Sequence, residues 1–122
     1  MHMLCIKSPP RAIAAVALLA SSTWHAAVAA PVQTDAAVAV TRSFAYTSFG
    51  GGDFVFTTSV GAAGCESGWY VKATDPGFKA AVATVLTAQA SGKSVFVYGD
   101  NADLWSGSSG HYCRLQTVAL IS

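Results

Sequence analysis

Residues 69–98, WYVKATDPGFKAAVATVLTAQASGKSVFVY, contain the pattern that decides the fold. Near the start of this stretch, Asp75 can accept hydrogen bonds from the free N–H groups of a starting helix, and Pro76 suits the first helical position. Apolar residues then recur at helical spacing until Ser91-Gly92, a pair typical of a helix C-terminus. The stretch therefore predicts one helix, capped by Asp75, between two strands.

Those two strands, and three more along the chain, are predicted from their β-branched and aromatic residues and from alternating apolar positions. The five segments are 36–46, 54–60, 69–73, 94–98 and 112–121. A glycine-rich segment joins the first two, which predicts a hairpin.

The predicted order is three strands, one helix and two strands, in a single domain of residues 30–122. A five-stranded Greek-key barrel of the OB type has this order, with its helix between the third and fourth strands. The fold class expected is therefore mainly β with one helix, built as a small OB-like barrel.

The first 29 residues have the features of a secretory signal peptide. Lys7 and Arg11 precede the apolar run 12–20, and small residues then satisfy the A-x-A rule for cleavage after Ala29. Cleavage after Ala30 would place a proline directly past the scissile bond and is disfavoured. The apolar run is shorter than the roughly 20 residues needed to span a bilayer. We therefore expect residues 1–29 to be removed and the protein to be exported, to the periplasm or beyond it.

Without the leader, five basic residues face six acidic ones, so the mature net charge is −1. The basic residues are scattered along the chain and form no cluster of the kind that binds phosphates. A nucleic-acid partner is not expected.

Removal of the leader also removes Cys5 and leaves Cys65 and Cys113. An even pair in an oxidising compartment predicts a Cys65–Cys113 disulfide, the alternative being two separate buried thiols.

The segment 99–113, GDNADLWSGSSGHYC, places a tryptophan among residues typical of solvated turns. Sugar binding requires an aromatic face and a few fixed polar groups. This part of the chain supplies both, so the candidate ligand-binding residues are Tyr98, Asp100, Asn101, Asp103 and Trp105. The alternative is that Trp105 packs onto the end of the barrel while the acidic residues form turns.

Catalytic and metal sites are weakly indicated. The serines of 106–110 do not form a nucleophile elbow, so a hydrolase using His111, the sole histidine of the mature chain, is the alternative to a non-enzymatic protein. The run 100–103 lacks the alternating oxygen ligands of a calcium loop. No metal or cofactor is expected.

Residues 65–105 resemble the OB-fold B subunits of bacterial AB-type toxins, particularly the subtilase-cytotoxin and pertussis-like branch. The matching positions are Cys65, Phe78, the turn 91–93, Val95, Val97, Tyr98 and Trp105. The resemblance implies a ring-forming, non-enzymatic subunit that binds cell-surface glycans, usually sialylated ones. The chain departs from the family in its cysteine pairing, because the family's partner cysteine lies in the second strand, and in Gly99, which replaces an aromatic residue.

Two functions follow as expectations. The first is an exported, disulfide-stapled binding module that resembles a toxin B subunit and binds glycans or a protein as a homo-oligomer. The second is a small monomeric periplasmic or secreted accessory or inhibitor protein with an unidentified partner.

Overall fold

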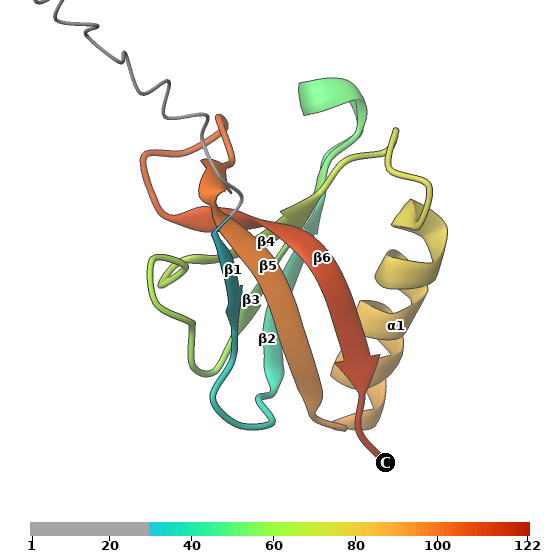
Figure 1. The fold of residues 1–122 in the computed structure, drawn as a ribbon. Helices are drawn as coiled ribbons and strands as arrows, with labels where there is room; N and C mark the ends of the chain where they lie inside the picture. Colours follow the sequence, from blue (N-terminus) through green and yellow to red (C-terminus); the bar gives the residue numbers. More distant parts are fainter. Residues whose placement is uncertain (1–29) are drawn as a thin grey trace, which may run out of the picture.

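A computed structural model describes residues 30–122, so the predicted leader, 1–29, lies outside the described residues. Residues 30–122 form six strands and one α-helix, together with a short 3₁₀ turn after the second strand (Figure 1). In order they are β1 (Pro31–Gln33), β2 (Val40–Ala45), the 3₁₀ turn η1 (Phe49–Gly51), β3 (Phe54–Thr58), β4 (Gly68–Val71), α1 (Phe78–Ser91), β5 (Val95–Leu104) and β6 (Tyr112–Leu120).

All six strands belong to one curved sheet with the order β1-β5-β6-β4-β3-β2. Only β4 and β6 run parallel, and the other neighbouring pairs are antiparallel. The helix joins β4 to β5 and packs against β6 and β2 (Figure 1). The prediction of a mainly β fold with one helix is confirmed, and the hairpin of β2 and β3 forms as expected.

The prediction of five strands is wrong, because β1 adds a sixth strand and the sheet stays open. Residues 31–33 are too few, and too poor in alternating apolar positions, to be recognised as a strand from sequence. They pair with Tyr98, Gly99 and Asp100 because β5 is long enough to offer them its edge.

The helix also begins later than predicted. It starts at Phe78 after Gly77, and no side chain caps it. Asp75 instead accepts from the Lys72 N–H at 3.0 Å and forms an ion pair with Arg114 of β6, so a tertiary charge contact replaces the predicted cap. At the other end Gly92 has a φ of 69°, the left-handed conformation that stops a helix.

The main core lies between the sheet and α1, where side chains such as Phe56, Trp69 and Val85 are completely buried. The predicted disulfide is confirmed: Cys65 and Cys113 are bonded, with 5.4 Å between their Cα atoms. It ties the loop before β4 to β6 and lies within this core. No helix among residues 30–122 is both long and apolar enough to cross a membrane.

A second, smaller cluster covers the opposite face of the sheet, which we call the outer face. It consists of Val55, Tyr70 and Trp105, with Phe44 and Tyr112 packed beside them. Side chains alternate between the two faces of a strand, so residues paired in register share a face. The strand register accordingly aligns one outer-face row across five strands: Phe44, Val55, Tyr70, Arg114 and Asp100.

Candidate binding site on the outer face of the sheet

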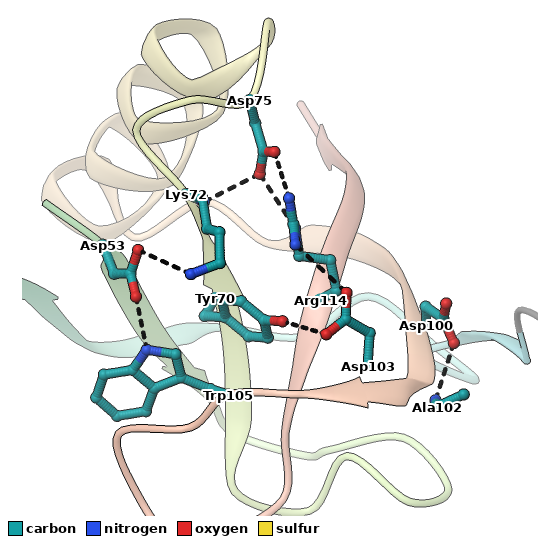
Figure 2. Close-up of polar contacts among 9 residues, drawn as sticks. All are labelled: Asp53, Tyr70, Lys72, Asp75, Asp100, Ala102, Asp103, Trp105 and Arg114. Carbon is teal, nitrogen blue, oxygen red and sulfur yellow. Dashed lines mark hydrogen bonds and ion pairs between the residues drawn. The ribbon is translucent and has the colours of Figure 1, made fainter. Parts of the chain in front are cut away.

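Trp105, the residue that drew attention in the sequence, is buried against the outer face and is only 6% exposed. Its indole Nε1 donates a hydrogen bond to Asp53 Oδ2 at 2.9 Å, across two distant parts of the chain (Figure 2). Its ring centroid lies 5.2 Å from that of Tyr46, 5.5 Å from Phe49 and 5.7 Å from Tyr112. This burial leaves almost none of the indole free for direct contact with a ligand.

The exposed aromatic surface is provided by the neighbours of Trp105. Tyr46 is 37% exposed and Phe49 is 45% exposed, and their ring centroids lie 6.1 Å apart. We call these two rings, with Trp105 as their floor, the aromatic platform. It forms where the loop between β2 and β3 meets the loop between β5 and β6.

Phe49 owes its position to a tight glycine turn. Gly50 has a φ of 64°, and a Cβ at this position would collide with the Asp53 carboxylate. The N–H of Asp53 in turn donates to the carbonyl of Phe49 at 3.1 Å. The glycine turn, the Asp53 carboxylate and the Trp105 indole therefore pack together as one unit.

Asp53 is a buried charge that connects the platform to the rest of the face. Its side chain is fully buried, and its Oδ1 lies 3.6 Å from Lys72 Nζ without a hydrogen-bond partner among the described residues. Lys72 Nζ also lies 5.8 Å from the centre of the Tyr70 ring. A buried carboxylate needs a cation and hydrogen bonds to offset its lost hydration. Lys72 supplies the cation, and Trp105 supplies a hydrogen bond to Oδ2.

A second polar group continues from Tyr70 to the start of α1 (Figure 2). The Tyr70 hydroxyl donates to Asp103 Oδ1 at 2.6 Å, and Arg114 donates to Asp103 Oδ2 at 3.3 Å. Arg114 also forms two hydrogen bonds with the carboxylate of Asp75. Both aspartates thus share one guanidinium.

These contacts shift three pKa values. Burial, followed by the hydrogen bond to Asp103, raises the pKa of Tyr70 to about 12. Burial alone would raise the pKa of Asp75, but hydrogen bonds from Arg114 and from the Lys72 N–H outweigh it, and the net shift is downward. The bond to Asp75 raises the pKa of Arg114, which stays charged. Asp75 and Arg114 therefore form an ion pair at neutral pH.

An open groove of about 590 Å³ lies beside Arg114, between the start of α1 and β6. Its walls combine the charged groups just described with small and apolar residues such as Ala80, Ala81 and Val118. The Arg114 guanidinium is already shared by Asp75 and Asp103, so the groove offers little positive charge to an anion.

The five predicted ligand-binding residues do not converge on one site. Asp103 and Trp105 belong to the polar contacts of the outer face, linked through Tyr70, Lys72 and Asp53. The remaining three lie toward β1. Tyr98 is exposed opposite Gln33, Asp100 accepts from the N–H groups of Ala30 and Ala102, and Asn101 donates to the Ala63 carbonyl.

His111 lies away from these groups, at the end of the loop that precedes β6. Its Nδ1 is 3.0 Å from Glu66 Oε2, and both side chains are more than half exposed. A backbone hydrogen bond, and then the contact with His111, lowers the pKa of Glu66. Within residues 30–122, no three His, Cys, Asp or Glu side chains are grouped to hold a metal ion.

Sequence reasoning missed Tyr46, Phe49 and Asp53, the residues that make the platform with Trp105. A signal was present: Tyr46 and Phe49 lie just before the glycine run 50–52, and Asp53 directly precedes a strand. Large aromatic residues beside a glycine turn are unusual for a plain hairpin loop. The pairing of this loop with Trp105, some fifty positions away, was visible only in the fold.

Comparison with protein-family models, with curated proteins and with solved structures finds no match to this chain. The functional assignment therefore rests on the geometry of the outer face.

Proposed function

We propose that this protein is an exported, disulfide-stapled binding module that recognises glycans through its aromatic platform. The observation that carries the proposal is the pair of exposed rings, Tyr46 and Phe49, fixed side by side on a buried tryptophan. Neighbouring aromatic rings that are exposed to water often mark a surface that another molecule covers.

The chemistry of the platform suits a pyranose ring. One face of a sugar presents C–H groups that pack on aromatic rings, while its hydroxyls require polar partners at the edge. Here the floor is rigid, because Trp105 is hydrogen-bonded to a buried carboxylate and enclosed by three other rings. A preformed surface loses little conformational entropy on binding.

Arg42 favours an acidic sugar. Its guanidinium carbon lies 5.7 Å from the centre of the Phe44 ring, which in turn lies 6.5 Å from the Tyr46 ring. Among the described residues, Arg42 forms no ion pair with a carboxylate. A free cation in line with the platform would pair with a sugar carboxylate, as in sialic acid.

The arrangement of the strands supports an OB-type fold as the more specific description of this mainly β domain. Five neighbouring strands have the order β2-β3-β4-β6-β5, with the helix inserted between β4 and β5. The bridge between Val38 and Val95 joins the segment before β2 to the start of β5, where closure of such a barrel would occur. OB domains use the loops after their first and fourth strands to bind oligosaccharides, and the platform lies on the corresponding loops here. A toxin-B-like homo-oligomer would repeat this surface and gain avidity.

A glycan array probed with the purified exported protein tests the proposal. Binding to a subset of glycans should fall at least tenfold in Phe49→Ala and Tyr46→Ala. It should persist in Val60→Ala, which removes an apolar side chain that is 65% exposed and lies outside the platform. Arg42→Gln should weaken binding to sialylated glycans more than to their desialylated counterparts.

Two results would overturn the proposal. One is a folded protein that binds no glycan on the array at any concentration tested. The other is glycan binding that Phe49→Ala and Tyr46→Ala leave unchanged. Native mass spectrometry of the same sample reports whether the binding species is a ring or a monomer, and a monomer would remove the toxin-like assembly from the proposal.

A further inference from the structure

The backbone of Ala30 is held at both its polar groups by β5. The N–H of Ala30 donates to Asp100 Oδ1 at 3.0 Å, and the carbonyl of Ala30 accepts from the Asn101 N–H at 3.0 Å. The next residue, Pro31, lies opposite Asp100 in the β1–β5 register. Asp100 therefore sits at the point where the chain enters the sheet.

Asp100 carries a charge that no cation offsets within the part of the chain that the structure describes. Its partners are two backbone N–H groups, and both bind Oδ1: that of Ala30 and that of Ala102, which Figure 2 shows. Arg114 is its cross-strand neighbour, but that guanidinium is bonded to Asp75 and Asp103. A half-buried carboxylate with neutral donors alone is incompletely stabilised.

We propose that Asp100 is the receptor for the α-ammonium group that removal of the leader creates at Ala30. This inference rests on the proposed export of the chain. A leader peptidase hydrolyses the amide between Ala29 and Ala30 with one water molecule. The water oxygen ends in the new carboxylate of Ala29, and the freed nitrogen of Ala30 takes up protons to become an ammonium group. Processing thus places a cation on the donor atom that already faces Asp100.

The geometry distinguishes between the two possible cleavage sites. Cleavage after Ala29 keeps both hydrogen bonds of Ala30 and turns a neutral donor into a charged one, which binds a carboxylate more strongly. Cleavage after Ala30 would remove both bonds and leave Pro31 as the first residue. Only the first product can anchor β1, whose pairing covers the edge of β5 and guards it against association with other chains.

The pair gives a defined pH dependence. Free α-amino groups have pKa values of about 8, and a neighbouring carboxylate favours the charged form and raises that value. Besides Asp100, the charged and titratable groups on the neighbouring strands are Tyr98 and Asp103 on β5 and Tyr112 and Arg114 on β6, while β1 has none. The loop to which Asn101 donates a hydrogen bond also carries Glu66, which is paired with His111. Because the folded value is raised, the stabilisation is complete below about pH 8 and is lost as the pH rises through the folded value.

Exported protein purified from the periplasm and from the medium provides the test. Mass spectrometry identifies the first residue, and melting temperature is then followed from about pH 7 to about pH 10 across the α-amino range. Asp100→Asn is the informative variant, because its amide oxygen still accepts both N–H groups while the charge is removed. Asp35→Asn, which alters a carboxylate outside the ion pairs of residues 30–122, is the matched control.

We expect Ala30 as the first residue, together with an alkaline loss of several degrees in Tm that Asp35→Asn retains and Asp100→Asn lacks. An exported protein that still carries residues 1–29 would overturn the proposed processing and this inference with it. A first residue of Pro31, or identical pH profiles in the native protein and Asp100→Asn, would overturn the role of Asp100 and leave export standing.

Discussion

The indole of Trp105 supports the proposed glycan-binding surface from below while being almost fully buried itself. Its ring supports Tyr46 and Phe49, and its N–H donates to the Asp53 carboxylate, whose one ion pair within residues 30–122 is with Lys72. Its position among solvated residues in the sequence reflects a loop that folds back onto the sheet. Under the proposed function, Trp105 would contribute to binding by stabilising and positioning the two exposed rings.

Trp105→Ala should therefore lower the free energy of unfolding by about 3–5 kcal/mol, as expected for deleting a buried aromatic side chain. The neighbouring Leu104→Ala, at a side chain that is 42% exposed, should change it by about 0.5 kcal/mol or less. Urea unfolding of both variants provides the measurement. A Trp105→Ala protein with native stability and lost glycan binding would instead show that the indole contacts the ligand directly.

Tyr70 should titrate later than an ordinary tyrosine, with a pKa of about 12, because it is buried and its hydroxyl donates to Asp103. Since the folded pKa is above the ordinary value of 10.0, its contribution to stability is complete below about pH 10 and is lost between about pH 10 and 12.

Phenolate absorbance measured against pH gives this value. Tyr70→Phe should remove the late step, and Asp103→Asn should shift it to lower pH because a negative neighbour is lost. If the high-pH titration step survives in Tyr70→Phe, the step belongs to another tyrosine.

At the scale of secondary-structure elements, the loop between β2 and β3 determines where the exposed rings of the aromatic platform lie. Gly50 and Gly51 both have left-handed φ angles, 64° and 85°. A Cβ on Gly50 would collide with Asp53, whereas a Cβ on Gly51 would have nothing within 4 Å. A side chain at either position would be placed in the left-handed backbone region, but only a side chain at position 50 would also collide with Asp53.

Gly51→Ala should thus cost about 1–2 kcal/mol, the usual penalty for a side chain in the left-handed region. Gly50→Ala should cost clearly more and should also weaken glycan binding, because Asp53 and Phe49 must move. Thermal unfolding and a binding titration on the two variants measure both effects. Equal losses of stability would mean that the contact between this turn and Asp53 is unimportant.

The elements that sequence alone could predict are those with a strong local pattern. Alternation and β-branched residues located five of the six strands, and Ser91-Gly92 located the end of the helix. The predicted segment 94–98 was too short, because β5 continues to Leu104 through residues that are typical of turns. The start of the helix was missed because Asp75 is bound by Arg114, a contact made across the fold. The same limit applies to the candidate site, where Trp105 was recognised while its partners, brought together only by the sheet, were not.

At the scale of the whole molecule, a small domain supports two layers on one sheet. Within residues 30–122, the inner layer under α1 is a continuous apolar core, whereas the outer layer has three buried hydrophobic residues with ion pairs beside them. A domain of this size buries only about two thirds of the surface exposed by its unfolded chain, so its stability is limited. The Cys65–Cys113 bond offsets that limit by restricting the unfolded state.

The bond closes a loop with a sequence separation of 48 residues, which corresponds to about 4 kcal/mol in the chain-entropy model. We expect the Cys65→Ala, Cys113→Ala double variant to lose about this much, with the urea midpoint as the measure. Both sulfurs lie in the core, so part of the loss comes from packing, and the native protein unfolded with and without reductant separates the two contributions. A difference below about 1 kcal/mol between the oxidised and reduced native protein would contradict the entropic role. It would mean that the two layers of side chains hold the sheet together unaided, and the aromatic platform would then survive in a reducing compartment.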